Sequence, residues 1–193
     1  MQVQLHWVHQ WHLTVLGQSY RRTTMAMTFH PDGRIDGFNR SSMPTGSMIN
    51  FVSSKKLGTQ STDSTSFIDI TDLSCTITPT SSSSKIYIAG SMNVNKENYT
   101  AIFRLMRDST EIALPSGTGG VNHIMTVYTA NNNGAWRATF QWDDTPGDTN
   151  PHTYKLQMRT DGGSDPTVHI GGHHDNSSSY SSPSYMTVME IAG

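Results

Sequence analysis

The most chemically suggestive part of the chain is HIGGHHDNSSSYSSPSY, residues 169–185, where His169, His173, His174 and Asp175 stand close together. Imidazole and carboxylate groups are suitable metal ligands. These histidines, however, flank a Gly-Gly break and precede a serine run, a pattern typical of an exposed loop. We expect such a loop here, and no metal. If it has a function, sugar or receptor contact is the alternative to metal binding, with His173, His174, Asp175 and Tyr180 as the candidate receptor-contact residues.

A second candidate site is WDDTPGDTN, residues 142–150, which carries Asp143, Asp144 and Asp148. Carboxylate oxygens are the ligands that calcium prefers. The spacing does not match a calcium loop, and Asp, Pro and Gly are ordinary turn-forming residues. The pattern therefore favours a turn over a cation site.

Catalytic motifs are missing from the sequence. There is no Gly-x-Ser-x-Gly elbow, no phosphate-binding loop and no His-Glu-x-x-His pair. Acidic residues that could cleave a sugar in pairs are few, and most lie in turn-like stretches. The single cysteine, Cys75, alternates with Leu73 and Ile77, which predicts a small core residue. We expect no enzymatic activity and no cofactor.

Tryptophans offer another kind of chemistry, because indole rings stack on sugars. The chain has Trp7, Trp11, Trp136 and Trp142. Trp136 and Trp142 alternate with Phe140, which predicts that these two face the core.

Composition narrows the class of protein. The chain has 193 residues, 34 % hydrophobic and only 15 % charged, with a formal net charge of −2. Ser, Thr, Asn and Gly fill the remainder, and β-forming residues occur throughout, as in a β-rich domain. The near-zero charge gives no electrostatic basis for binding nucleic acid. No segment is apolar enough for membrane insertion.

Short apolar runs recur between polar turns from about residue 48 onward. They predict strands over 48–53, 66–70, 73–78, 85–94, 100–107, 122–129, 135–142, 152–160, 167–170 and 185–191. Residues 122–142 give the clearest hairpin signal, since Asn133-Gly134 is a strong two-residue turn. The predicted fold is all-β, an antiparallel two-sheet sandwich.

The N-terminal part differs from this pattern. Alternating apolar residues in 1–24, from Val3 to Val15, predict a strand, and the HPDG turn and the SSMPTGS loop break residues 25–47. We therefore divide the chain into an extended N-terminal docking segment and lead-in, residues 1–47, and a sandwich, residues 48–193. Residues 1–24 dock onto another chain or fold back on their own sandwich; the sequence leaves both open.

The motifs in STSFIDITDLSCTITPTSSSSKI, residues 64–86, resemble the C-terminal domain of phage tail-fibre and virion structural proteins. An R-L-x-R-x-x-T strand at 104–110, a T-Y-K-L-Q strand at 153–157 and a terminal M-E-I at 189–191 extend the similarity, and residues 25–47 resemble the start of such proteins. The resemblance implies a jelly-roll-like domain, similar to the heads of tumour necrosis factor and complement proteins. It also implies a homotrimer located in a virion.

The expected function is a trimeric fibre or fibre-like appendage that aids host attachment. Residues 1–47 would contact other virion proteins, and the sandwich would contact a host surface glycan or protein. The main alternative is an architectural capsid-decoration or tail-connector protein with no receptor role. A polysaccharide depolymerase is a remote alternative, because the chain is too short for a long β-helix.

Overall fold

The computed structural model describes residues 28–29, 35–36, 43–96, 100–116, 123–128, 136–163, 167–172 and 181–193. The chain divides into two compact units, Met1–Phe38 and Asn39–Gly193. In the first unit, β1 (Thr28–Phe29) pairs antiparallel with β2 (Ile35–Asp36). The ordered elements of the described residues are all strands, and none of these residues belongs to a helix that could cross a membrane.

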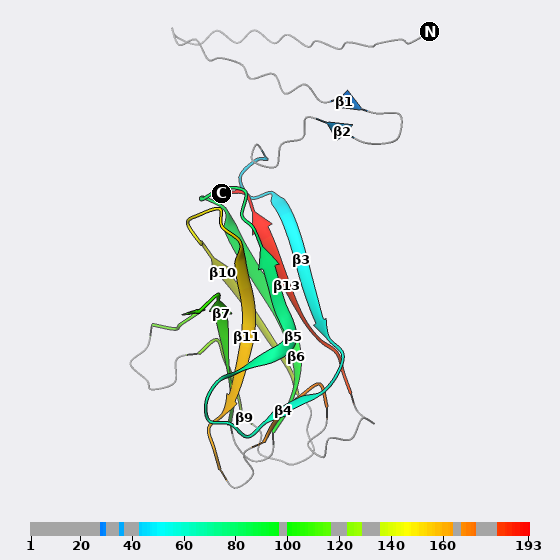
Figure 1. Cartoon of the computed structure of the whole chain (residues 1–193), viewed down its shortest axis with the longest axis vertical. Coiled ribbons are helices and arrows are strands. Elements are labelled where there is room, and N and C mark those ends of the chain that lie inside the picture. Colours follow the sequence, from blue (N-terminus) through cyan, green and yellow to red (C-terminus); the bar gives the residue numbers. More distant parts are fainter. Residues whose placement is uncertain are drawn as a thin grey trace. The chain divides into compact units, whose positions relative to one another are not determined.

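The second unit is a sandwich of two antiparallel sheets (Figure 1). Sheet I contains β3 (Met48–Lys56), β4 (Gln60–Thr62), β6 (Lys85–Lys96), β10 (Trp136–Asp144), β12 (Val168–Ile170) and β13 (Ser184–Ile191). Sheet II contains β5 (Ile68–Ile77), β7 (Thr100–Arg107), β8 (Thr110–Ile112), β9 (Met125–Tyr128) and β11 (His152–Thr160). The fold class predicted from the sequence is confirmed.

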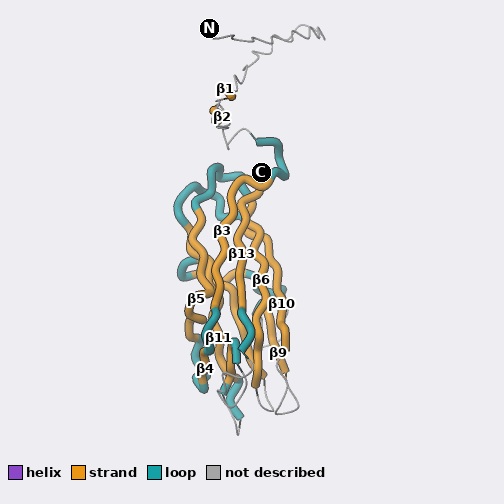
Figure 2. The backbone as a smooth tube through the Cα atoms, turned by 90° about the vertical axis from the view of Figure 1, so that its right-hand side faces the viewer, coloured by secondary structure: helices purple, strands orange, loops and turns teal. Residues whose placement is uncertain are grey.

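The strand order is that of a jelly roll. β12 and β13 pair in line along the same side of β6, and β4 and β3 pair in line beyond them, so sheet I reads β3/β4, β13/β12, β6, β10. Sheet II reads β5, β11, β7, β8/β9 by the same logic. Between these positions the chain keeps crossing from one sheet to the other, as in a doubly wound Greek key. Figure 2 shows the long strands running side by side.

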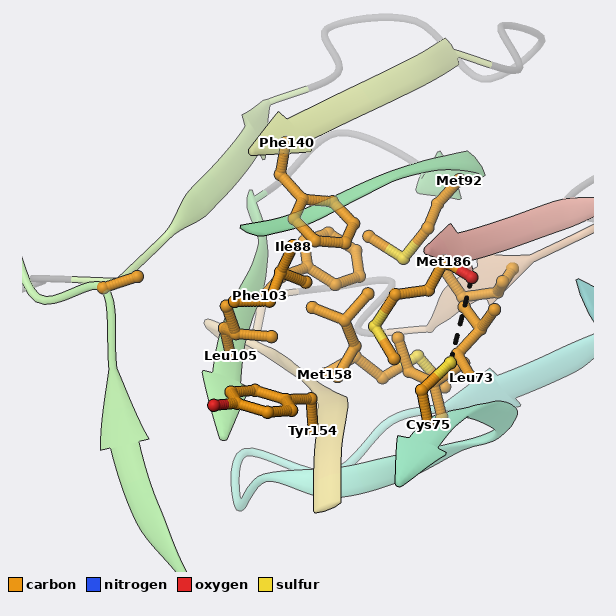
Figure 3. Packing of buried hydrophobic residues seen from close by; sticks show 14 of the residues in the cluster. Leu73, Cys75, Ile88, Met92, Phe103, Leu105, Phe140, Tyr154, Met158 and Met186 are labelled. Atoms are coloured by element: carbon orange, nitrogen blue, oxygen red, sulfur yellow. Dashed lines mark hydrogen bonds between the residues drawn. The ribbon is translucent and has the colours of Figure 1, made fainter. Parts of the chain in front are cut away.

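The core fills the space between the sheets. Alternation places Tyr154, Leu156 and Met158 of β11 inward, and each of these side chains is fully buried. Figure 3 labels Tyr154 and Met158 within the core cluster that also contains Phe103, Ile88 and Met92. Cys75 is buried as predicted, with its Sγ 3.9 Å from the carbonyl oxygen of Met186. Burial raises the pKa of this thiol.

One strand replaces the two predicted over 66–70 and 73–78. β5 is continuous, but its pairing with β11 shifts register between Lys155 and Gln157, and Asp72 has a φ of 65°. The Gln60 side chain fills this bulge: its Nε2 donates to the Asp69 carbonyl, and its Oε1 accepts from the Thr71 amide. The bulge lets both Ile70 and Leu73 point into the core.

The predicted hairpin over residues 122–142 is wrong. β9 pairs with β7 in sheet II, whereas β10 pairs with β6 in sheet I, so the two strands lie in opposite layers. Asn133-Gly134 falls outside the described residues. The local turn signal is overruled because β10 pairs with the long central strand β6 over nine residues, Trp136 to Asp144.

The core position predicted for Trp136 and Trp142 is also wrong. They share the inward side of β10 with Phe140, but they are 56 % and 37 % exposed, whereas Phe140 is 8 % exposed. β10 is an edge strand of sheet I. Alternation gives the side of a sheet that a residue faces, and it does not say whether the opposite layer extends far enough to cover it.

The sandwich has two distinct ends. At the near end, residues 43–47 enter beside the C terminus, and the Gly46 and Ala192 amides donate to the carbonyls of Ala192 and Ser47. The near end also holds the connections 78–84 and 145–151. At the far end lie the connections between β3, β4 and β5, and the strand ends that border residues 97–99, 129–135, 164–166 and 173–180 (Figure 1).

Gly90 of β6 offers a sharp test of core packing. A Cβ at this position would lie 2.6 Å from the Phe140 ring and 2.7 Å from the Tyr185 carbonyl oxygen. We expect Gly90→Ala to lower the free energy of unfolding by about 1–3 kcal/mol, because the ring and a paired strand must both shift.

The measurement is denaturant unfolding at one fixed protein concentration. Gly58→Ala is the matched control, since nothing lies within 4 Å of a Cβ there. Equal midpoints for the two variants would contradict the packing described for β6 and β10.

Candidate functional site

The loop predicted to contact a receptor leaves the far end between β12 and β13. His173, His174, Asp175 and Tyr180 themselves lie outside the described residues. The base of the loop is described, and it is tightly held. The Gly171 amide donates to the Asn93 carbonyl, and the Ser182 amide donates to the Gly171 carbonyl, at 2.9 and 3.0 Å.

Side chains reinforce this base. Ser184 Oγ accepts from the Asn93 amide at 3.2 Å, and the Arg137 guanidinium donates to the Pro183 carbonyl at 2.6 Å. Gly171 has a φ of 80°, and a Cβ there would lie 2.8 Å from the Gly58 carbonyl oxygen. Glycine is therefore required where the chain leaves the sheet. The structure thus provides a fixed frame from which residues 173–180 depart.

His169 does not belong to this loop. It lies within β12, opposite Ser61 of β4 and Asn95 of β6, and it is 6 % exposed. His173, His174 and Asp175, which stand near it in the sequence, lie outside the described residues.

The three aspartates of residues 142–150 make different contacts. Asp144 accepts hydrogen bonds from Arg107 and from the Tyr154 hydroxyl, both at 2.7 Å. Burial, together with the Asp144 carboxylate, raises the pKa of Tyr154. Asp143 is exposed on β10, and Asp148 contacts His152. Asp144 thus ties sheet I to sheet II at the near end.

His152 is held between two carboxylates. Its Nδ1 lies 2.8 Å from Asp108 Oδ2, and its Nε2 lies 3.1 Å from Asp148 Oδ1. Burial alone would raise the pKa of Asp108, but the His152 ring and the Thr153 amide hold it below its ordinary value. This cluster fastens the β7–β8 turn to the start of β11. It contains no nucleophile for the histidine to activate.

A buried carboxylate closes the near end. Glu190 of β13 has no exposed surface, and its Oε1 accepts from the Thr80 amide, the Thr80 hydroxyl and the Ser84 hydroxyl at 2.6, 2.7 and 2.8 Å. The serine-rich connection between β5 and β6 therefore wraps an acid on the strand that ends the chain. Sequence alone gave no sign of this partnership.

The outer face of sheet II carries a cluster built around Phe67. The guanidinium carbons of Arg104 and Arg159 lie 4.1 and 5.2 Å from the centre of its ring, and His123 packs edge-on at 4.9 Å. Glu111 bonds both His123 and Arg104. The two arginines make cation–π contacts with the Phe67 ring, and Glu111 contacts Arg104 and His123. The charged groups of this cluster therefore have partners within the fold.

Further polar contacts cross the same sheet face. Arg104 also donates to Gln157 Oε1 at 2.6 Å, and Asp69 accepts from Gln157 and from Lys155. Motif positions in three separate strands are thus joined across one sheet face. Among the described residues, no group of three or more His, Cys, Asp or Glu side chains is arranged to hold a metal ion.

Comparison with known proteins adds no relative. No family model matches the chain, and no curated protein sequence matches it.

Glu190 can be tested by two substitutions. We expect Glu190→Leu to lower the free energy of unfolding by about 2–4 kcal/mol, because it leaves three donors of the 78–84 connection without their acceptor. Glu190→Gln keeps one acceptor oxygen, so its cost should be smaller, about 1 kcal/mol.

Denaturant unfolding of both variants at matched concentration provides the measurement. A Leu variant as stable as the wild type would show that the carboxylate does not hold this connection in place.

Proposed function

We propose that this chain is a structural protein of a phage particle, a trimeric fibre-like appendage that aids attachment to the host and has no catalytic activity. The virion assignment rests on the sequence motifs. The observation that carries the self-association is an exposed apolar surface on the outer side of sheet I, which we call the sheet I face.

The sheet I face follows the pairing of its strands. Phe51 of β3 lies opposite Met189 of β13, which lies opposite Tyr87 of β6. The next row toward the near end holds Met48, Ile191 and Lys85. Phe51 is 54 % exposed and Met48 57 % exposed. Burying each such side chain contributes about 1.5–3 kcal/mol, so a face of this kind favours association.

The next row toward the far end consists of small uncharged residues, Ser53, Thr187 and Ala89. The row beyond it holds Lys55, Tyr185 and Ser91. Small side chains at the centre let another surface approach closely. Since they carry no charge, their burial does not require a charged group to be desolvated. The face therefore suits contact with a second protein copy.

The far end supports contact with the host. Its connecting segments, residues 57–67, 97–99, 129–135, 161–167 and 171–183, contain no lysine or arginine and are rich in Ser, Asn and Gly. Residues of this kind provide adaptable hydrogen bonding in binding loops. They point to a host glycan or a protein surface, with His173, His174, Asp175 and Tyr180 as candidate contacts.

The near end supports attachment to the particle, because the chain enters the sandwich there. Residues 1–47 would join other virion proteins and leave the far end free. This arrangement separates particle binding from host binding along one long sandwich.

Particle assays test this proposal. We expect mass spectrometry to find the protein in purified particles, and particles lacking it to assemble but to adsorb poorly to host cells. Adding the purified full-length protein beforehand should compete with adsorption of intact particles. Normal adsorption combined with fragile particles would instead identify the architectural alternative, and absence from particles would reject both.

Self-association is tested by light scattering on the full-length protein. We expect a mass of three copies, and we expect Phe51→Asp to shift it toward one copy, because a charge on the sheet I face would be buried without a partner. Ser74→Asp is the matched control, since Ser74 is exposed on the outer side of sheet II. A wild-type protein that stays monomeric at micromolar concentration would refute the trimer.

A further inference from the structure

A lysine, a threonine and a glutamine from three consecutive strands meet beside the bulge of β5. Lys56 ends β3, Gln60 begins β4, and Thr71 lies in β5. The Lys56 Nζ donates to Thr71 Oγ1 at 2.8 Å, and Thr71 Oγ1 donates to Gln60 Oε1 at 2.9 Å. A hydroxyl group, which can act as a nucleophile, thus lies between an amine and a carboxamide.

The Gln60 carboxamide is held at both of its ends. Its Oε1 also accepts from the Thr71 amide at 2.8 Å, and its Nε2 donates to the Asp69 carbonyl at 2.9 Å. Because a carbonyl bond is about 1.2 Å long, Thr71 Oγ1 lies at most about 4 Å from the carboxamide carbon Cδ. Well-oriented reacting atoms stand about 3–3.5 Å apart, so a small rotation of either side chain brings these two atoms into reach.

The environment of Lys56 favours its neutral form. The residue is 2 % exposed, and burial lowers the pKa of its ammonium group, an effect that the nearby Asp72 carboxylate opposes. A lower pKa increases the fraction of neutral amine at a given pH. Lysines of this kind serve as general bases, and Lys56 is within hydrogen-bond distance of the hydroxyl proton that a base would remove.

We propose that Thr71 and Gln60 become joined by an ester bond, formed once in the folded chain with loss of ammonia. Neutral Lys56 takes the proton from Thr71 Oγ1, and this oxygen attacks Gln60 Cδ. The negative charge that develops on Gln60 Oε1 is stabilised by the Thr71 amide, which already donates to it. Lys56 then gives its extra proton to Gln60 Nε2, the C–N bond breaks and ammonia leaves. The atoms balance without another reactant.

The ester would link the two layers of the sandwich. Gln60 belongs to β4 of sheet I, and Thr71 belongs to β5 of sheet II. They stand 11 residues apart in the chain, so a bond between them closes a loop and restricts the unfolded state. With Cys75 as its single cysteine, the chain can form no internal disulfide for this purpose. The inference needs neither the proposed trimer nor the proposed place in a particle.

Mass spectrometry of the full-length protein tests the inference. We expect the wild type to be lighter than its sequence predicts by one ammonia molecule. Chymotrypsin cleaves after Phe67, between the two residues, and should still leave the peptides that carry Gln60 and Thr71 joined. Hydroxylamine should separate them, because it attacks esters and spares amides.

Variants assign the bond to these residues. Thr71→Val should abolish the loss of ammonia, and Thr71→Ser should retain it, because serine keeps the hydroxyl group. Thr76→Val is the matched control on the same strand and should also retain it, since Thr76 contacts Thr153 and not Gln60. Lys56→Met should slow the reaction, which removes the base but neither of the two groups that become bonded.

Three results would overturn the inference. The first is a wild-type mass equal to that of the sequence even after the folded protein is kept at mildly alkaline pH, where more of Lys56 is neutral. The second is the mass of a simple deamidation at Gln60, which would show that no ester persists. The third is a link that resists hydroxylamine and includes Lys56, which would be an amide in place of the ester.

Discussion

The connection that joins the two layers of the sandwich is held by a single buried carboxylate, Glu190. Glu190 belongs to the last strand, and the donors that satisfy it belong to the connection between β5 and β6, more than a hundred residues earlier. That connection crosses from sheet II to sheet I. Fixing it therefore fixes how the two layers are joined, and β6, which follows directly, pairs with β10, β12 and β13.

Other charged side chains also join separate parts of the sandwich. Asp144 joins the sheets through Arg107 and Tyr154, Asp108 holds a turn through His152, and Arg104 gathers partners on the outer side of sheet II. In each case the charged group is already hydrogen-bonded within the fold, as buried or half-buried polar groups must be. Asp144 and Asp148, which the sequence offers as possible cation ligands, thus make contacts within the fold.

A structural feature can be predicted from the sequence alone when its cause lies in neighbouring residues. Alternation in Tyr154, Leu156 and Met158 identified a core strand, since the period of a strand is local. The sequence predicts two strands, 66–70 and 73–78, where the structure has one. The reason is that the bulge at Asp72 is stabilised by Gln60, a residue from another strand. The Asn133-Gly134 turn suggested a hairpin, but pairing with β6 placed the two strands in different sheets. The burial of Trp142 was misjudged for a related reason: coverage depends on the opposite layer.

The frame at Gly171 and Ser182 has a consequence for how such a protein can change. β12 and β13 occupy one line of the sheet, interrupted where Gly171 and Ser182 bond to each other. The pairing of the sheet therefore fixes where the chain leaves and re-enters it, at Gly171 and Ser182. It places no requirement on the residues between these two positions. Segments of other lengths and compositions can therefore be exchanged at 173–180 while the strands on either side keep their pairing.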